Sequence, residues 1–160
     1  MRNIIYLFTR SLIAQMARIK VTLPDTFSFT TEIPVRITDL NYGGHLGNDA
    51  LLSILHEARV HFLRSIGMES DYDPISKLGL IMVDVAIEYK GEAFHGDVLR
   101  IQMAAADLNK YGFDVVYHAH NQAGKEIARA KTGMLCFDYN VRKLRLLPEE
   151  LAARVGPPSQ

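Results

Sequence analysis

The segment between residues 39 and 48 holds the residue types best suited to chemistry on a carbonyl group. It reads Asp39-Leu40-Asn41-Tyr42-Gly43-Gly44-His45-Leu46-Gly47-Asn48. Three glycines in so short a stretch predict a loop with backbone angles that other residues rarely adopt. Because this loop precedes a predicted helix, the backbone N–H groups of Gly43, Gly44 and His45 could point at a carbonyl oxygen and stabilise negative charge on it. The alternative is that the glycines only permit a tight turn.

Two side chains of this loop add to the predicted chemistry. The imidazole of His45 can polarise a carbonyl group or hold a water molecule, although a hydrogen bond that only stabilises the loop explains a histidine here equally well. The amide of Asn41 can orient a water molecule or a carbonyl group, but it cannot accept a proton at neutral pH. A general base must therefore be sought elsewhere.

Three carboxylates near the loop are candidates for that base. We expect Glu57, which stands among apolar residues of the predicted helix, to be partly buried, and burial would raise its pKa toward a value useful in catalysis. The alternative is that Glu57 pairs with Arg59, His61 or a backbone group and only secures the helix. Asp49 is better explained as a cap of the helix, and Asp39 as an anchor of the loop.

Histidine and cysteine elsewhere in the chain point to no further site. His118 and His120 share one face of a predicted strand, which is the minimal geometry for two metal ligands, but no third ligand is evident nearby. We therefore predict surface histidines and no metal. The lone Cys136 lies in an apolar stretch, where we expect a buried and unreactive thiol. A chain with one cysteine forms no internal disulfide, which favours a reducing compartment, and we expect the cytoplasm.

Composition limits the classes of function. The 160 residues suffice for one domain, and 18 Lys and Arg balance 18 Asp and Glu, so no overall field attracts nucleic acid or an anionic membrane. We expect an extension over 1–22, disordered or with translation starting at Met16, and a single domain over 23–160. The longest apolar run near the start, residues 4–8, is far too short to span a membrane.

Periodicity predicts five long strands and one long helix. The strands are expected at 27–38, 78–89, 97–107, 111–121 and 126–138, the helix at 48–66, and a short helix at most at 148–154. Short links after residue 89 predict that successive strands pair antiparallel as a meander. Apolar residues on several sides of the helix predict that it is surrounded. The expected fold class is α+β, with one curved antiparallel sheet wrapped around a central helix.

This order of elements, together with the loop motif, resembles the hotdog-fold thioesterases, specifically the 4-hydroxybenzoyl-CoA thioesterase-like and acyl-carrier-protein thioesterase-like group. In that group a strand ends in an Asp-x-Asp pair, a Gly-His-Val-Asn-Asn-like turn follows, and the helix contains Glu-x-Arg, here Glu57-Ala58-Arg59. Further agreement comes from Gly96-Asp97-x-Leu99 and from Arg142-Lys143-Leu144-Arg145-Leu146-Leu147-Pro148. The resemblance covers about residues 27–155.

One position departs from the family pattern. The second Asp of the pair is the nucleophile or general base in relatives, and the matching residue here is Asn41. The resemblance implies either that another carboxylate does this work or that the protein binds its ligand without hydrolysing it.

The resemblance implies an acyl-CoA thioesterase that acts as a homodimer or a dimer of dimers, with no cofactor other than the coenzyme A of its substrate. The expected catalytic residues are Asn41, His45, Glu57 and Gly44. The expected substrate-binding residues are Asp39, Tyr42, Gly43, Asn48 and Asp49. The rival hypothesis is a non-catalytic protein that binds acyl-CoA or acyl-carrier protein. A hydratase or dehydratase on the same fold is a weaker third alternative.

Overall fold

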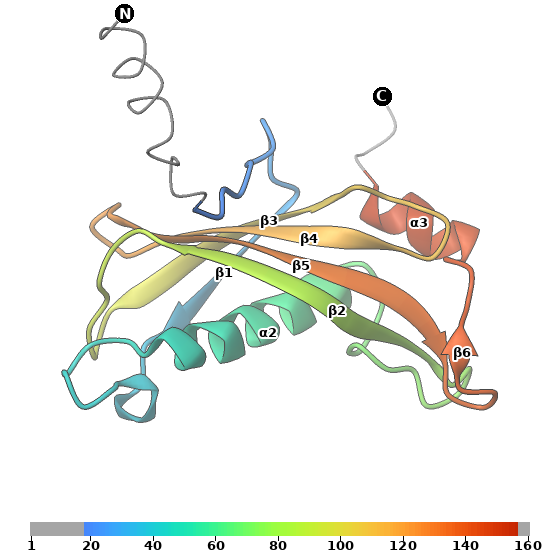
Figure 1. Cartoon of the computed structure of the whole chain (residues 1–160), viewed down its shortest axis with the longest axis horizontal. Coiled ribbons are helices and arrows are strands. Elements are labelled where there is room, and N and C mark those ends of the chain that lie inside the picture. Colours follow the sequence, from blue (N-terminus) through green and yellow to red (C-terminus); the bar gives the residue numbers. More distant parts are fainter. Residues whose placement is uncertain (1–17, 157–160) are drawn as a thin grey trace, which may run out of the picture.

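The computed structural model describes residues 18–156, so the expectations for residues 1–17 lie outside the described part of the chain. One antiparallel sheet and a long helix on its concave face make up the molecule (Figure 1). The elements in chain order are β1 (Phe29–Pro34), η1 (Ile37–Asp39), α2 (Asn48–Ser65), β2 (Leu78–Tyr89), β3 (Val98–Ala106), β4 (Gly112–His120), β5 (Glu126–Asp138), β6 (Lys143–Leu144) and α3 (Glu149–Val155). The α+β hotdog architecture expected from the sequence is confirmed.

The order of the strands corrects the predicted meander. The sheet runs β1-β3-β4-β5-β2, with β6 paired to β5. Only β3, β4 and β5 form a meander, because β2 pairs with β5 and not with β3. The link from β2 to β3 crosses three strand spacings, about 14 Å. Its eight residues, 90–97, can span up to about 26 Å, so a short link did not require neighbouring strands.

The first strand is shorter than predicted. The expected strand over residues 27–38 is confirmed only as β1, which ends at Pro34, and η1 follows it. Proline has no N–H to continue a ladder. The Asp39 carboxylate then accepts the Arg36 N–H at 2.8 Å and turns the chain into η1. The strand therefore stops five residues before the loop that carries the candidate chemistry.

Helix α2 agrees with its prediction to within one residue. Gly67, with a φ of 87°, ends it, and the Met68 N–H bonds to the Leu63 carbonyl at 2.9 Å. The helix buries one face against the sheet through Leu51, Ile54, Leu55, Ala58, Phe62 and Leu63. Each of the leucine, isoleucine and phenylalanine side chains in this set contributes roughly 1.5–3 kcal/mol of stability on burial.

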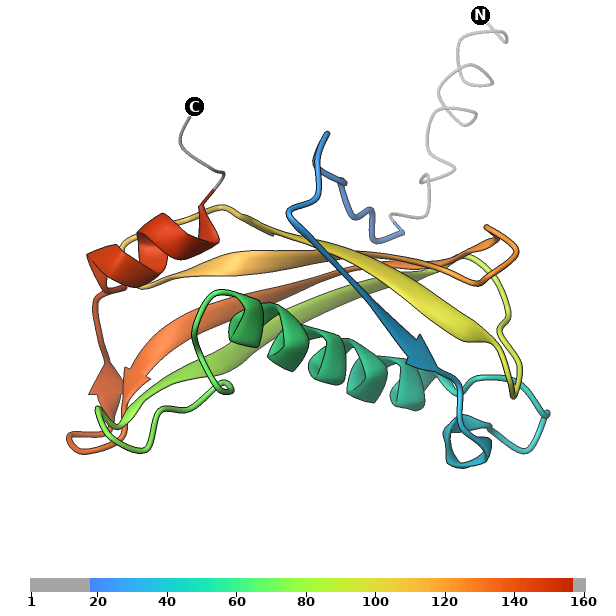
Figure 2. The same ribbon diagram turned by 180° about the vertical axis from the view of Figure 1, so that it is seen from behind.

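The opposite face of α2 is exposed, which corrects the prediction of a helix surrounded on several sides. Ser53, Glu57 and Arg64 lie on this face. Figure 2 shows the helix resting beneath the sheet, with β1 crossing it. Within residues 18–156 no helix is both long and apolar enough to cross a membrane.

Candidate active site

The glycine-rich loop closes on itself through Asn41. The Asn41 side-chain oxygen accepts the Gly43 N–H at 2.9 Å, and the Asn41 carbonyl accepts the Gly44 N–H at 2.9 Å. Gly44 adopts a φ of 81°, which explains a glycine there. The expectation that these two N–H groups stabilise an oxyanion is therefore wrong, because both are used inside the turn.

Asp39 holds the loop in place through both its carboxylate and its backbone carbonyl. Its carboxylate accepts from the Arg36 side chain at 3.0 and 3.1 Å, and its carbonyl accepts the Gly47 N–H at 2.9 Å. The hydrogen-bonded Arg36 guanidinium holds the pKa of the Asp39 carboxyl below its ordinary value. Because the side chain is only 6% exposed and already paired, Asp39 serves the loop and not the substrate.

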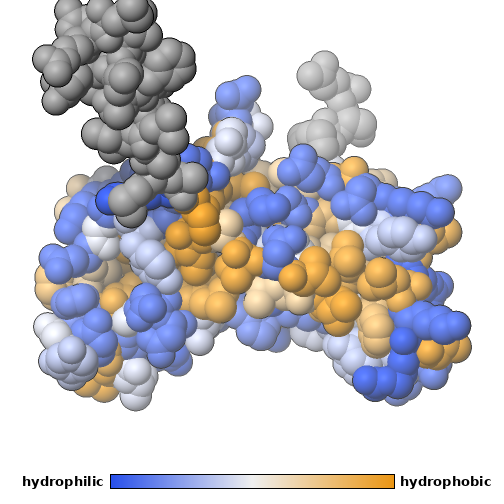
Figure 3. All heavy atoms as spheres, viewed as in Figure 1, coloured by the Kyte–Doolittle hydropathy of each residue, from blue (hydrophilic) through white to orange (hydrophobic). Residues whose placement is uncertain are grey.

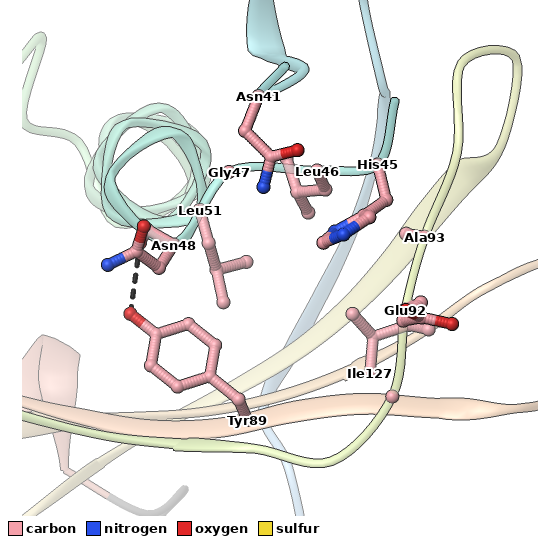
Figure 4. Close-up of a pocket in the computed structure, with 11 residues that line it drawn as sticks. Asn41, His45, Leu46, Gly47, Asn48, Leu51, Tyr89, Glu92, Ala93 and Ile127 are labelled. Carbon is pink, nitrogen blue, oxygen red and sulfur yellow. Dashed lines mark hydrogen bonds between the residues drawn. The ribbon is translucent and has the colours of Figure 1, made fainter. Parts of the chain in front are cut away.

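A pocket of about 210 Å³ opens between the loop, the start of α2 and the link after β2 (Figure 4). It is lined by Asn41, His45, Leu46, Gly47, Asn48, Leu51, Tyr89, Gly91, Glu92, Ala93 and Ile127. The side chains of Asn41 and His45 point into it from the loop. The Tyr89 hydroxyl donates to the Asn48 carbonyl at 3.0 Å and fixes the end of β2 against the start of α2.

Of the site residues predicted from the sequence, Asn41, His45 and Asn48 line this pocket together. Tyr42 is fully exposed, and the remaining predicted substrate-binding and catalytic residues, Asp39, Gly43, Gly44, Asp49 and Glu57, are not among its lining residues.

No pattern in the sequence identified the pocket residues Tyr89, Glu92, Ala93 and Ile127 as part of a site. They reach the pocket through strand pairing and through the link after β2, where the Leu46 N–H bonds to the Ala93 carbonyl at 2.8 Å. Only the order of the strands reveals that this link passes beside the loop.

The first turn of α2 supplies donors to the pocket. Leu51 N–H bonds back to the Gly47 carbonyl, but within residues 18–156 no hydrogen bond uses the N–H groups of Asn48, Asp49 and Ala50. Unpaired N–H groups at a helix start carry partial positive charge. Among the described residues, the start of α2 therefore has unpaired donors beside the pocket, whereas the N–H groups of Gly43 and Gly44 are used inside the turn.

Glu57 does not have the environment predicted for it. Its side chain is exposed rather than partly buried, and it stands nine residues after Asn48, about 13 Å along the helix. The alternative side-chain partners are wrong as well, since Arg59 pairs with Asp71 and His61 bonds to Thr31. Whether Glu57 acts as a base stays a prediction.

A buried arginine organises the middle of α2. The Arg59 Nε and Nη2 atoms donate to the Asp71 carboxylate at 3.0 and 2.9 Å, and the guanidinium is 5% exposed. Its Nη1 atom is buried without a partner among the described residues. The His56 Nε2 atom lies 3.0 Å from the same carboxylate. Beneath Arg59, the hydroxyls of Tyr117 and Thr132 bond to each other, and burial raises the pKa of Tyr117.

His118 and His120 lie on the outer face of the sheet. Their rings meet edge to face at 4.1 Å, and the His118 Nε2 atom lies 2.8 Å from the Glu126 carboxylate. Desolvation lowers the pKa of His120. The described residues contain no cluster of three side chains suited to a metal ion.

Comparison with known proteins gives consistent matches. The family model described as thioesterase-like superfamily matches residues 35–155. A 1,4-dihydroxy-2-naphthoyl-CoA hydrolase from Synechococcus elongatus is 32% identical over 73% of this chain and 87% of its own.

Two solved structures illustrate the likeness of the fold. A 1,4-dihydroxy-2-naphthoyl-CoA thioesterase from Synechocystis superposes with a TM-score of 0.71 at 22% identity, covering 79% of this chain and 94% of its own. A gentisyl-coenzyme A thioesterase superposes with a TM-score of 0.73 at 18% identity, covering 80% and 100%.

Proposed function

This chain belongs to the thioesterase-like superfamily, and from that premise we propose that it hydrolyses an acyl-coenzyme A thioester to the free acid and coenzyme A. The observation that carries the proposal is the pocket that Asn41, His45 and the start of α2 form together. The 32% identical relative, named as a hydrolase of an aromatic acyl-CoA, supports the class of reaction.

The free N–H groups at the start of α2 stabilise the oxyanion. As water attacks, the thioester carbonyl oxygen gains negative charge, and donors fixed in advance cost no rearrangement at that moment. The removal of one such donor typically costs about 3 kcal/mol of barrier. Asn48 provides such a donor at the wall of the pocket, and the free N–H groups of Asp49 and Ala50 follow it in the first turn of α2.

Asn41 and His45 position the reactants. Because the Asn41 oxygen is held by the Gly43 N–H, its NH₂ group is left to donate to water or to the thioester oxygen. His45, whose ring points into the pocket, holds the water or polarises the carbonyl. Neither role requires Asn41 to ionise, so the change from Asp at this position does not by itself abolish hydrolysis.

The direct test is thiol release from a panel of acyl-CoA substrates with short, long and aromatic acyl groups. We expect turnover of at least one class, and a fall in kcat of about 10²-fold or more in His45→Ala, as for loss of a positioned catalytic group. Acyl-CoA binding without turnover of any class would reject hydrolysis and favour the non-catalytic binder.

We propose a homodimer formed through the β2 edge of the sheet. The other edge strand, β1, has six residues and ends in Pro34, features that discourage pairing. Strand β2 has twelve residues and exposes Met82, Val83 and Val85. Analytical ultracentrifugation checks the dimer.

The proposal further includes no cofactor beyond the coenzyme A of the substrate, and a cytoplasmic location that suits the single thiol.

A further inference from the structure

We infer that, in the homodimer proposed above, His56 of one subunit, held by its own Asp71, is the general base for the pocket of the other subunit. The inference rests on the proposed thioester hydrolysis. It names a residue that does not line the candidate pocket of its own subunit.

His56 and Asp71 have the geometry of an oriented base. The His56 Nε2 atom bonds to the Asp71 Oδ2 atom at 3.0 Å, and the two hydrogen bonds from buried Arg59 fix that carboxylate. With Nε2 donating to Asp71, the Nδ1 atom is left as the proton acceptor. The His56 side chain is 59% exposed, so its ring is accessible to a ligand. A base oriented by a carboxylate recurs wherever an imidazole activates a nucleophile.

Within one copy this base cannot reach the pocket. His56 stands eight residues after Asn48, which places it about 12 Å further along the helix axis. The base must therefore act on a site that another molecule presents beside the middle of α2.

A second copy of the chain can pair with the part of the β2 edge that has no hydrogen-bonded neighbour. At its beginning the edge is covered, because Leu80 N–H bonds to the Asp71 carbonyl and Asp73 N–H to the Leu78 carbonyl. From Met82 onward, no backbone hydrogen bond among the described residues covers it. Figure 3 shows an apolar band across this face of the molecule, where β2 lies in Figure 1, and exposed Met82, Val83, Val85 and Tyr89 belong to β2.

The pattern of charged and apolar residues along β2 favours one register for its pairing with β2 of a second copy. Lys90 N–H bonds to the Ile127 carbonyl, so in an antiparallel ladder the backbone groups of Val85, Ile87 and Tyr89 point outward. A two-fold axis at Ile87 sets Val85 opposite the partner's Tyr89 and Asp84 opposite the partner's Lys90. Apolar residues then meet apolar ones and opposite charges meet twice, which favours this register.

This register brings the partner's His56 to the pocket. Tyr89 touches the start of α2 through Asn48, and α2 and β2 run in opposite directions. Ile87 lies two residues before Tyr89, about 7 Å along the strand, which matches four to five residues of helix. The axis therefore passes near Leu52, and the start of α2 faces positions 56 and 57 of the partner helix.

Of these two positions, His56 points in the required direction. Its contact with Asp71, whose neighbours pair with β2, places it on the β2 side of the helix. Glu57 is turned a further 100° around the axis, on the face exposed away from the sheet. Ser53, which is exposed on the same helix and lies outside the predicted site, is the control for His56.

The step balances without a further reactant. The partner's His56 Nδ1 takes a proton from water, and the water oxygen bonds to the thioester carbon while the carbonyl electrons move to the oxyanion. Collapse breaks the C–S bond, and the coenzyme A thiolate takes the proton from the imidazolium.

The test is complementation between two defective subunits with different affinity tags. His56→Gln and His45→Ala homodimers are each expected to lose at least about 10²-fold in kcat. Their purified heterodimer carries one site with both defects and one with neither, so we expect about half the parent kcat. Ser53→Ala, on the exposed face of α2, should keep kcat within about twofold of the parent, and Glu57→Gln is measured beside it as the rival base.

Each negative outcome of the complementation test has its own interpretation. A heterodimer as inactive as both homodimers, prepared from an active parent, overturns the assignment of His56 in trans but leaves the hydrolysis proposal standing. Loss of activity in Glu57→Gln with full activity in His56→Gln overturns it too. A parent that turns over no acyl-CoA overturns the proposed function and this inference together.

Discussion

Asn41 shows that a change of one residue can remove proton transfer from a site while the structure of its loop is kept. Its side-chain oxygen keeps the hydrogen bond to Gly43 that holds the turn, while the amide nitrogen remains for the pocket. A carboxylate could perform the first task and would add a charge. The amide therefore separates the architecture of the loop from the proton transfer, which must be supplied by another residue.

Asp39→Asn tests the anchor of the loop. The folded-state pKa of Asp39 is lowered, so its ionised form adds stability that is present above the unfolded pKa, about 3.9, and is lost as the pH falls through the lower folded value. We expect Asp39→Asn to lower the free energy of unfolding by about 1–3 kcal/mol at pH 7, and by much less below pH of about 3.

Urea unfolding at both pH values measures this loss. Exposed Asp25→Asn is the control and should leave the free energy of unfolding within about 0.5 kcal/mol. Equal losses for Asp39→Asn at both pH values would contradict the role of the Asp39 charge.

The thiol of Cys136 should be unreactive in the native protein. Burial raises the pKa of its thiol to about 11, and the side chain is fully buried between strands. We expect no reaction with a thiol reagent at pH 8 until denaturant is added, and then one equivalent of thiol. Rapid labelling of the folded protein would show that the sheet opens around Cys136. The sequence predicted this burial correctly, because a lone cysteine inside an apolar strand has few other places to go.

At the scale of elements, local patterns located the strands and α2 well, but they did not identify the neighbours of each strand. The bounds of β2 and β5 agree with prediction to the residue, since alternation and turns are local signals. The pairing of β2 with β5 depends on the whole core. For this reason Asn41 and His45 could be placed in the site from the sequence, whereas Tyr89 and Glu92 could not.

Substitution of two glycines with similar positive φ values distinguishes the effect of loop shape on activity from its effect on stability. Gly44 and Gly124 have φ values of 81° and 76°, and neither would bring a Cβ within 4 Å of another atom. Each change to Ala should cost about 1 kcal/mol in the free energy of unfolding. Only Gly44→Ala should also lower kcat/KM, by about tenfold or more, since the turn positions Asn41 and His45. Equal activity of the two variants would mean that the turn tolerates displacement.

At the scale of the whole molecule, the inferred dimer would make the single chain an incomplete enzyme. The pocket opens beside the end of β2, the long edge is apolar, and the oriented imidazole lies where its own pocket is out of reach. These three features are explained together by one two-fold axis. No pattern along the sequence contains that axis, because it relates surfaces that exist only after folding.

A charge exchange tests the proposed register. Asp84→Lys places lysine opposite the partner's Lys90 at two symmetric points, and we expect the dimer dissociation constant to rise about tenfold. The double variant Asp84→Lys with Lys90→Asp restores opposite charges and should recover most of the affinity. Sedimentation equilibrium measures both, with Glu32→Lys on the β1 edge as a control expected to be neutral. Failure of the double variant to recover would place the axis elsewhere.

The positions of β1 and β2 on opposite sides of the meander also govern how the chain reaches its native state. Phe29 pairs with Met103 and Leu78 with Asp138, so both outer strands join residues more than 50 positions away. Ladders of such high contact order close late, because the entropy of a long loop is lost before contacts repay it. The hairpins of β3, β4 and β5 can form first, and the glycine-rich loop acquires its contact with Ala93 only when both flanks have docked. Folding in milliseconds to seconds, with the catalytic end ordered last, is the kinetic signature that this topology imposes.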